Sequence, residues 1–280
     1  MKAPLKLGAF GVGLAATFGA ALGVGHLSGI HGARPAATHG SAHGGAHSGM
    51  TASVEPVGLA VTQDGYSLQV DQSTLPLGTR STLSFQIHGP QGVVTSYTKT
   101  HDRELHLIVV RRDLSSFQHV HPTRAADGTW SVPLTLDAAG PYKVYADFAP
   151  GTRTDALVLA TDVTVPGSYT PNPIGEATTT SVTGGDTVTL DGQLAAGSPS
   201  ALMLTVTRDR KPVALQPYLG AFGHLVVIRT GDLAYLHVHP EEGEGLHFLA
   251  DVPSTGTYRA FLDYQHDDVV RTAAFTVTAH

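Results

Sequence analysis

The chain has 280 residues, a formal net charge of −6 and only 14% charged residues. This length allows two domains of ordinary size, each large enough to bury its own core. Lysine and arginine form no cluster beyond the first few residues, which excludes a nucleic-acid-binding surface. Cysteine is absent and methionine numbers only three, so disulfides and thiolate metal sites are excluded and a thioether copper site is not expected. Any metal must therefore be bound by imidazole and oxygen.

Glycine and proline are abundant, at 32 and 17 residues, and hydrophobic residues make up 41% of the chain. This composition favours short strands joined by turns over long surface helices. We therefore predict an all-β protein.

The N-terminal segment has the layout of an export signal. Lys2 and Lys6 precede an uncharged, mostly apolar run from Leu7 to Val24. A basic start and an apolar stretch are typical of a signal peptide, and roughly 20 apolar residues can also span a membrane. We predict that residues 1–27 form an apolar helix, favouring a transmembrane anchor over a cleaved signal peptide. The rest of the chain would then lie on the extracytoplasmic face of the cell membrane, or be secreted if cleavage occurs.

Residues 28–57 are rich in glycine, alanine, serine and histidine, and contain little that could form a core. We predict a flexible tether. Its histidines could capture metal weakly, or could be incidental to the biased composition; they include His31, His39, His43 and His47.

An internal repeat with a period near 118 residues follows the tether. The segment from His106 to Pro122 resembles His224 to Pro240, and Gly140 to Phe148 resembles Gly256 to Tyr264. A stretch rich in proline and glycine separates the copies. We predict a first repeat over residues 58–166, a linker over 167–178 and a second repeat over 179–280.

Each repeat shows about seven short strand patterns in roughly 100 residues. Tyr142, shortly after Gly140, has the sequence context of the corner tyrosine of immunoglobulin-like sandwiches. We predict two tandem Greek-key β-sandwiches, immunoglobulin-like or cupredoxin-like, with a small closed barrel as the alternative. The first repeat's expected strands cover residues 67–70, 81–87, 105–111, 117–121, 129–136, 142–148 and 156–165.

Each repeat carries the same spacing of three histidines. His119 and His121 alternate on a strand and therefore share a face, and a short hairpin brings His106 opposite one of them. The three share that face only if paired residue numbers sum to an odd value. Both copies keep separations of 13 and 15 residues although their turns differ, which favours a metal site over a structural role for the histidines. The predicted ligands are His106, His119, His121, His224, His237 and His239.

Two aspartates occupy equivalent places in otherwise apolar strands of the two repeats. The simpler interpretation of Asp147 and Asp263 is a surface ion pair with Lys143 or Arg259 on the same strand face. The alternative is a fourth metal ligand, or a carboxylate that orients a ligand histidine. Imidazole and oxygen ligands suit Cu(II) first and Zn(II) next.

The paired blocks Leu105 to Leu114 with Phe117 to Pro122, and their counterparts in the second copy, resemble a family of exported bacterial proteins with two such repeats. Its members are sometimes described as heavy-metal-binding. The resemblance implies export and duplication more directly than it implies metal chemistry. The chain also has a looser resemblance to periplasmic copper-resistance carriers, which are small β-sandwiches that bind Cu(II) through histidines.

Three functions remain open at this point. We favour a binding protein without enzymatic activity, which sequesters divalent metal or hands it to other envelope metal-handling proteins. A structural or adhesive pair of sandwiches without metal is the alternative. A cupin-like metalloenzyme is a weaker one, since Glu244 follows the second histidine pair at a cupin-like spacing, whereas the first copy has Asp127 one place later.

Overall fold

A computed structural model describes residues 56–280, apart from residues 152, 154, 237 and 241–244. The described residues form strands, turns and coil only, which confirms the all-β prediction. The predicted apolar helix and nearly all of the tether lie outside them. Among the described residues no helix is long and apolar enough to cross a membrane.

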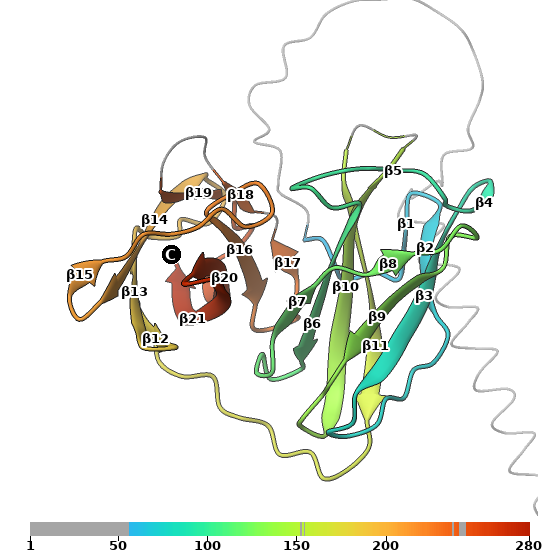
Figure 1. Ribbon diagram of the computed structural model, residues 1–280, viewed down its shortest axis with the longest axis horizontal. Helices are drawn as coiled ribbons and strands as arrows, with labels where there is room; N and C mark the ends of the chain where they lie inside the picture. Colours follow the sequence, from blue (N-terminus) through green and yellow to red (C-terminus); the bar gives the residue numbers. More distant parts are fainter. Residues whose placement is uncertain (1–55, 152, 154, 237, 241–244) are drawn as a thin grey trace, which may run out of the picture. The chain divides into compact units, whose positions relative to one another are not determined.

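The first repeat is a sandwich of two antiparallel sheets (Figure 1). One sheet has the order β1-β2-β3-β9-β8, with β4 beside β3, and the other has the order β11-β10-β6-β7, with β5 beside β10. The bounds are β1 Thr62–Gln63, β2 Tyr66–Val70, β3 Ser81–Gly89, β4 Gly92–Val93, β5 Tyr97–Thr98, β6 Leu105–Arg111, β7 Gln118–Val120, β8 Thr123–Arg124, β9 Trp130–Leu134, β10 Gly140–Pro150 and β11 Leu157–Val165.

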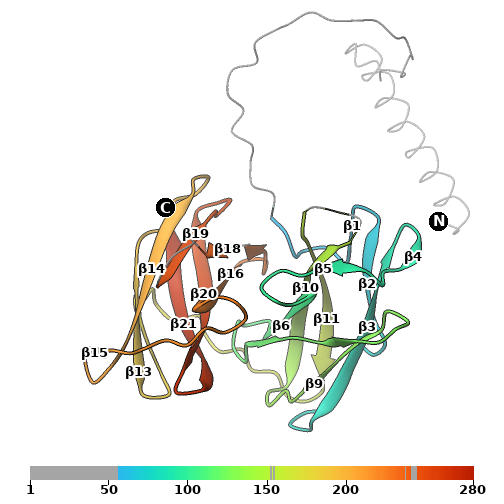
Figure 2. The same ribbon diagram turned by 45° about the horizontal axis from the view of Figure 1, so that its top comes forward.

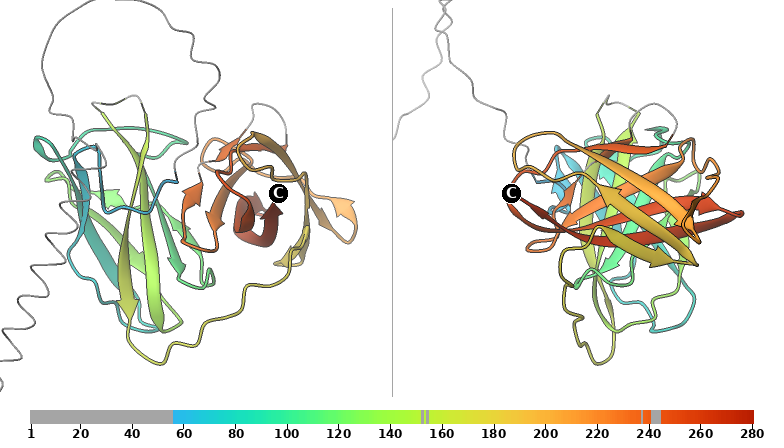
Figure 3. Two further views of the ribbon diagram at one scale, coloured as in Figure 1. Left: turned by 180° about the vertical axis from the view of Figure 1, so that it is seen from behind. Right: turned by 90° about the vertical axis from the view of Figure 1, so that its left-hand side faces the viewer.

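The second repeat has the same arrangement. Its sheets have the orders β12-β13-β14-β19-β18, with β15 beside β14, and β17-β16-β20-β21. Figure 3 shows the long hairpin of β20 and β21 in this repeat. The linker between the repeats, from β11 to β12, contains no strand. The bounds are β12 Thr180–Thr183, β13 Asp186–Asp191, β14 Ser200–Arg208, β15 Lys211–Pro212, β16 Gly223–Arg229, β17 Tyr235–Leu236, β18 Val238–Pro240, β19 Leu246–Ala250, β20 Gly256–His266 and β21 Val269–Ala279.

The strand orders are those of an immunoglobulin-like Greek key. In the first repeat the chain crosses from β3 and β4 to the opposite sheet at β5 and β6, returns at β8 and β9, and crosses again to β10 (Figure 1, Figure 2). The second repeat makes the same crossings between β14, β16, β19 and β20. The prediction of two tandem Greek-key sandwiches is therefore confirmed.

Alternating side chains fill the core of each sandwich. On β3, Leu83, Phe85 and Ile87 are fully buried, while the residues between them are only partly covered. Trp130 stacks beside Phe85 with ring centroids 6.5 Å apart. Each such side chain contributes roughly 1.5–3 kcal/mol to folding. The period of two in the sequence therefore assigns the faces of these strands.

Both sandwiches contain the corner tyrosine. The Tyr142 hydroxyl donates to the carbonyl of Ala138 at 2.8 Å, and the Tyr258 hydroxyl donates to the carbonyl of Ser254 at 2.7 Å. Both tyrosines are fully buried at the start of a central strand. The prediction made for Tyr142 from its sequence context is confirmed, and it extends to the second repeat.

A third apolar core joins the two sandwiches. The rings of Phe117 and Phe261 stack with centroids 4.1 Å apart, and the Tyr145 hydroxyl donates to the carbonyl of Leu233 at 2.7 Å. This contact explains why β6 and β16 are apolar on both faces: one face lines its own sandwich and the other meets the neighbouring repeat. The buried members are Ile108, Val110, Leu114, Tyr145, Val158, Ala160, Val226, Ile228, Leu233, Tyr235 and Phe261.

We predict that residues 58–280, expressed without the preceding segment, form a soluble and largely β protein. Residues 52–280 make up one compact unit, and every core described above lies within it. Circular dichroism checks this directly. A spectrum dominated by helix or by random coil would contradict it.

Replacing either corner tyrosine by phenylalanine should lower the free energy of unfolding by about 1 kcal/mol, because one hydrogen bond to a carbonyl is lost while the ring is kept. Tyr142→Phe and Tyr258→Phe should give similar losses in urea unfolding. Tyr169→Phe, at a 37% exposed position, is the control and should change stability little.

Candidate metal centre

The pairing of β6 with β7 positions the first histidine trio. Leu107 pairs with Val120 and Ile108 with His119, so paired residue numbers sum to an odd value, as convergence of the trio requires. Extended by one residue beyond the end of β7, this register places His106 opposite His121. His119 lies diagonally across from His106, and all three side chains point to one face of the sheet.

The turn between the strands is held by Asp113. Its carboxylate accepts hydrogen bonds from the guanidinium of Arg111 and from the backbone and hydroxyl of Ser115, and Leu114 adopts a positive φ of 59°. Burial alone would raise the pKa of Asp113, but these bonds and one from the Asn172 amide outweigh it and hold the pKa well below its usual value. A charged, fully bonded carboxylate thus fixes the turn, and with it the register.

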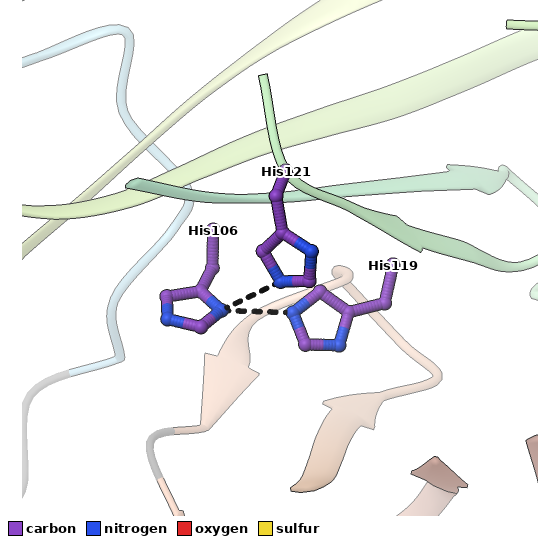
Figure 4. A group of neighbouring side chains, drawn as sticks. All are labelled: His106, His119 and His121. Carbon is purple, nitrogen blue, oxygen red and sulfur yellow. Dashed lines mark hydrogen bonds between the residues drawn. The ribbon is translucent and has the colours of Figure 1, made fainter. Parts of the chain in front are cut away.

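The three imidazoles converge on one point (Figure 4). His106 Nδ1 lies 3.0 Å from His119 Nε2 and 3.2 Å from His121 Nε2. Nitrogen ligands about 2.0–2.1 Å from a tetrahedral ion lie about 3.3 Å from one another. The ring centroids, 5.3, 5.0 and 4.9 Å apart, agree with the separation of about 5 Å expected for imidazoles on such an ion.

The outer ring nitrogens of two of these histidines have hydrogen-bond acceptors as partners. His106 Nε2 lies 2.9 Å from the carbonyl of Thr100, and His119 Nδ1 lies 2.9 Å from Asp263 Oδ2. Each outer nitrogen must therefore carry the proton, which leaves an unprotonated lone pair on His106 Nδ1 and on His119 Nε2. These two lone pairs face each other at 3.0 Å, and either a shared proton or a metal ion between them would relieve their repulsion.

Burial keeps the imidazoles of His106 and His121 neutral. Desolvation is the main cause that lowers the pKa of His106 to about 4 and that of His121 to about 3, below the ordinary value of 6.5. The neighbouring histidines contribute further, because one imidazolium disfavours another. Neutral imidazole is the form that binds metal, so the site presents ligands without prior deprotonation at neutral pH.

The second repeat reproduces one feature of the first site, the hydrogen bond at its first histidine. His224 Nε2 lies 2.9 Å from the carbonyl of Tyr218, six residues earlier, just as His106 meets Thr100. The pairing of β16 with β17 is limited to Val227 with Leu236 and Ile228 with Tyr235, and His239 lies on β18, which pairs with β19 of the other sheet. His237 and the side chain of His239 lie outside the described residues, so the second trio stays a prediction.

Asp263 is not on the surface, and the expectation of a surface ion pair is wrong for it. Asp263 is 4% exposed and accepts a hydrogen bond from His119 of the other repeat. Lys143 instead pairs with Asp162, and Arg259 donates to Thr276. The carboxylate of Asp147 accepts a hydrogen bond from the hydroxyl of Tyr235, again from the other repeat.

The trio lies at the junction of the repeats, which sequence reasoning missed. A cavity of about 50 Å³ is lined by residues of both, including His106, His119, Asp147 and His224. The ring of His224 lies 6.3 Å from that of His106, and the His101 ring lies 5.1 Å from His224. His101 has no counterpart in the second repeat and belongs to no spacing pattern, so no sequence signal marks it.

The cupin-like alternative finds no support at these positions. Asp127 is exposed in a turn, where its carboxylate accepts a hydrogen bond from the Thr129 amide. Glu244 lies outside the described residues.

A family model described as a domain of unknown function (DUF8832) matches residues 60–166 and 180–280. The chain belongs to the DUF8832 family. It holds two matched segments of that domain, and each segment spans one sandwich. No curated protein matches the sequence.

Several solved structures are distantly similar to this DUF8832 protein. The Escherichia coli adhesin FdeC is 14% identical with a TM-score of 0.26, covering 80% of this chain and 67% of that one. Invasin, a bacterial integrin-binding protein, is 13% identical with a TM-score of 0.24, covering 81% of this chain and 42% of that one. A putative membrane-anchored protein from Corynebacterium diphtheriae is 8% identical with a TM-score of 0.24, covering 77% and 57%. Similarity this low carries no argument about function.

The metal-free protein should lose stability as the pH falls from about 6.5 towards 4. In that window the unfolded chain binds protons on His106 and His121 while the folded chain does not, so acid favours unfolding. Each histidine contributes a slope of at most about 1.4 kcal/mol per pH unit. Urea unfolding of chelator-treated protein between pH 4.5 and 7.5 measures this.

The double variant His106→Gln with His121→Gln should show a shallower dependence over the same window. An equal slope in the variant and the parent protein would contradict the assignment of these two histidines as the buried neutral groups.

Proposed function

We propose that this DUF8832 protein binds a divalent transition metal, Cu(II) or Zn(II), through His106, His119 and His121. It would act as an exported envelope protein that sequesters the ion or hands it on. The export signal over residues 1–27 supports the location, and the absence of cysteine together with the imidazole ligands supports these two metals.

One observation carries the proposal: the two facing lone pairs of His106 and His119. A proton could bridge that single pair, but His121 Nε2 also lies within 3.2 Å of the same His106 nitrogen. One metal ion satisfies all three nitrogens at once, at distances that a tetrahedral ion imposes. The carbonyl and carboxylate behind His106 and His119 are the partners that metal-ligating histidines ordinarily have.

The second trio, His224, His237 and His239, is proposed as an equivalent site on the strength of the repeat. His224 supports this, because its outer nitrogen meets a carbonyl in the same way as that of His106. Burial also lowers the pKa of His224 to about 4, so it too is neutral at physiological pH. The protein would then take up about two ions.

A structural or adhesive role without metal is the second candidate. It is favoured by the bond between His119 and Asp263, which joins the repeats directly, and by β-sandwiches being common in cell-surface proteins. In that case the trio would share protons and serve only the contact between the repeats.

Residues 58–280, purified without the tether, should bind about two equivalents of Zn(II) or Cu(II), and replacing His106, His119 and His121 together by alanine should remove about one of them. A single alanine at any of the three should weaken that site steeply. Elemental analysis and calorimetric titration measure both quantities. Affinity should fall only as the pH approaches about 4, because burial lowers the pKa of His106 and His121 and protons then compete for the same nitrogens.

His88→Ala is the matched control, because His88 lies on β3 in the opposite sheet of the same repeat. It should leave the stoichiometry unchanged. If the triple variant binds as much metal as the parent protein, the trio is structural and the second candidate replaces the first.

A further inference from the structure

We propose that the first metal site is completed across the two repeats: Asp263 of the second repeat positions His119 of the first, so that metal binding strengthens the docking of the repeats. This inference rests on the proposed metal function. It makes the ion a link between two sandwiches, although its three nitrogen ligands all belong to one of them.

The contact between His119 and Asp263 is buried and fixed on both sides. Their side chains are 4% and 6% exposed, and Nδ1 lies 2.9 Å from Oδ2. The other carboxylate oxygen of Asp263 accepts a hydrogen bond from Thr272 at 2.5 Å. Asp263 therefore cannot rotate away without breaking a second bond, and it fixes which nitrogen of His119 faces the other two histidines.

Apolar packing brings these two residues together. Phe117 precedes His119 by two positions and Phe261 precedes Asp263 by two, and the two rings stack at 4.1 Å with an angle of 6° between their planes. Because side chains two apart share a face of a strand, the aromatic stack aligns the histidine with the carboxylate. The aromatic stack and the contact between His119 and Asp263 thus form one unit of the interface.

A related contact between an aromatic pair and a strand aspartate occurs with the roles of the repeats exchanged. Tyr235 is the counterpart of Phe117, and Tyr145 is the counterpart of Phe261. The rings of Tyr235 and Tyr145 lie 5.5 Å apart, and the Tyr235 hydroxyl donates to Asp147. Each repeat therefore places its strand aspartate against a side chain of the other. The carboxylate contact across the repeats is thus a feature of both halves of the interface.

Thermodynamic linkage turns this geometry into coupling. A carboxylate on the outer nitrogen makes an imidazole a stronger ligand, and loss of such a partner typically reduces metal affinity about 10- to 100-fold. Since coupling is reciprocal, a bound ion must strengthen the contact between His119 and Asp263 by the same factor. The ion should therefore slow the opening of the interface on the second repeat.

The test uses the full chain with its five histidines before residue 50 replaced by serine, so that no tether ligand contributes. Zn(II) affinity is measured by competition with a chelator for the parent protein, Asp263→Ala and Asp263→Asn. Asp263→Ala should weaken the first site about 10- to 100-fold. Asp263→Asn should recover much of that loss, because the amide oxygen still accepts the His119 proton. Asp162→Ala removes an exposed carboxylate and should have no effect.

Hydrogen exchange supplies the second measurement, on protein that also carries His237→Ala and His239→Ala so that no ion binds the second trio. Zn(II) should slow amide exchange in β16 and β20, which hold no remaining proposed ligand apart from His224. Asp263→Ala at saturating Zn(II) should lack this effect.

The outcomes separate the two proposals. If the parent protein binds no Zn(II), the proposed function fails. If it binds but Asp263→Ala binds equally well, or β16 and β20 exchange at the same rate with and without Zn(II), the coupling is overturned and the metal function stands. Should Asp263→Ala not fold, Asp263→Asn and the exchange measurement on the parent protein decide.

Discussion

The packing of one sandwich against the other is the contact on which the site depends. Strands β6 and β16 are buried on both faces, since each lines its own core and also the shared one. His106 and His224, the second residues of these two strands, are buried as well. Without the second repeat, the outer faces of these strands would be exposed apolar surface and the histidines would be solvated.

Desolvation then decides the chemistry of the histidines. An imidazole in water is half protonated near pH 6.5, whereas His106, His121 and His224 are held neutral well below that pH. The outer nitrogens of His106 and His224 are bonded to carbonyls, so these neutral rings present lone pairs on their inner nitrogens. The same apolar contact that stabilises the two-domain unit therefore also surrounds the histidines of the proposed metal site.

Much of the fold follows from local sequence pattern. The period of two along β3, the glycine before Tyr142 and the hairpin from β6 to β7 depend on neighbours within a few residues or on one turn, so they can be predicted. The convergence of His106 with His119 and His121 follows in turn, because strand alternation and a single register fix it. The internal repeat supported this prediction, because both copies show the same spacing of three histidines.

The sequence by itself determined the strands and their faces and singled out the histidine trio, since these follow from backbone geometry and spacing over short distances. Only the tertiary structure decided that Asp263 holds a histidine of the other repeat, and that His101 and His224 lie beside the first trio. His119 and Asp263 are 144 residues apart. No local periodicity encodes that contact, because it arises from the fit of two folded surfaces.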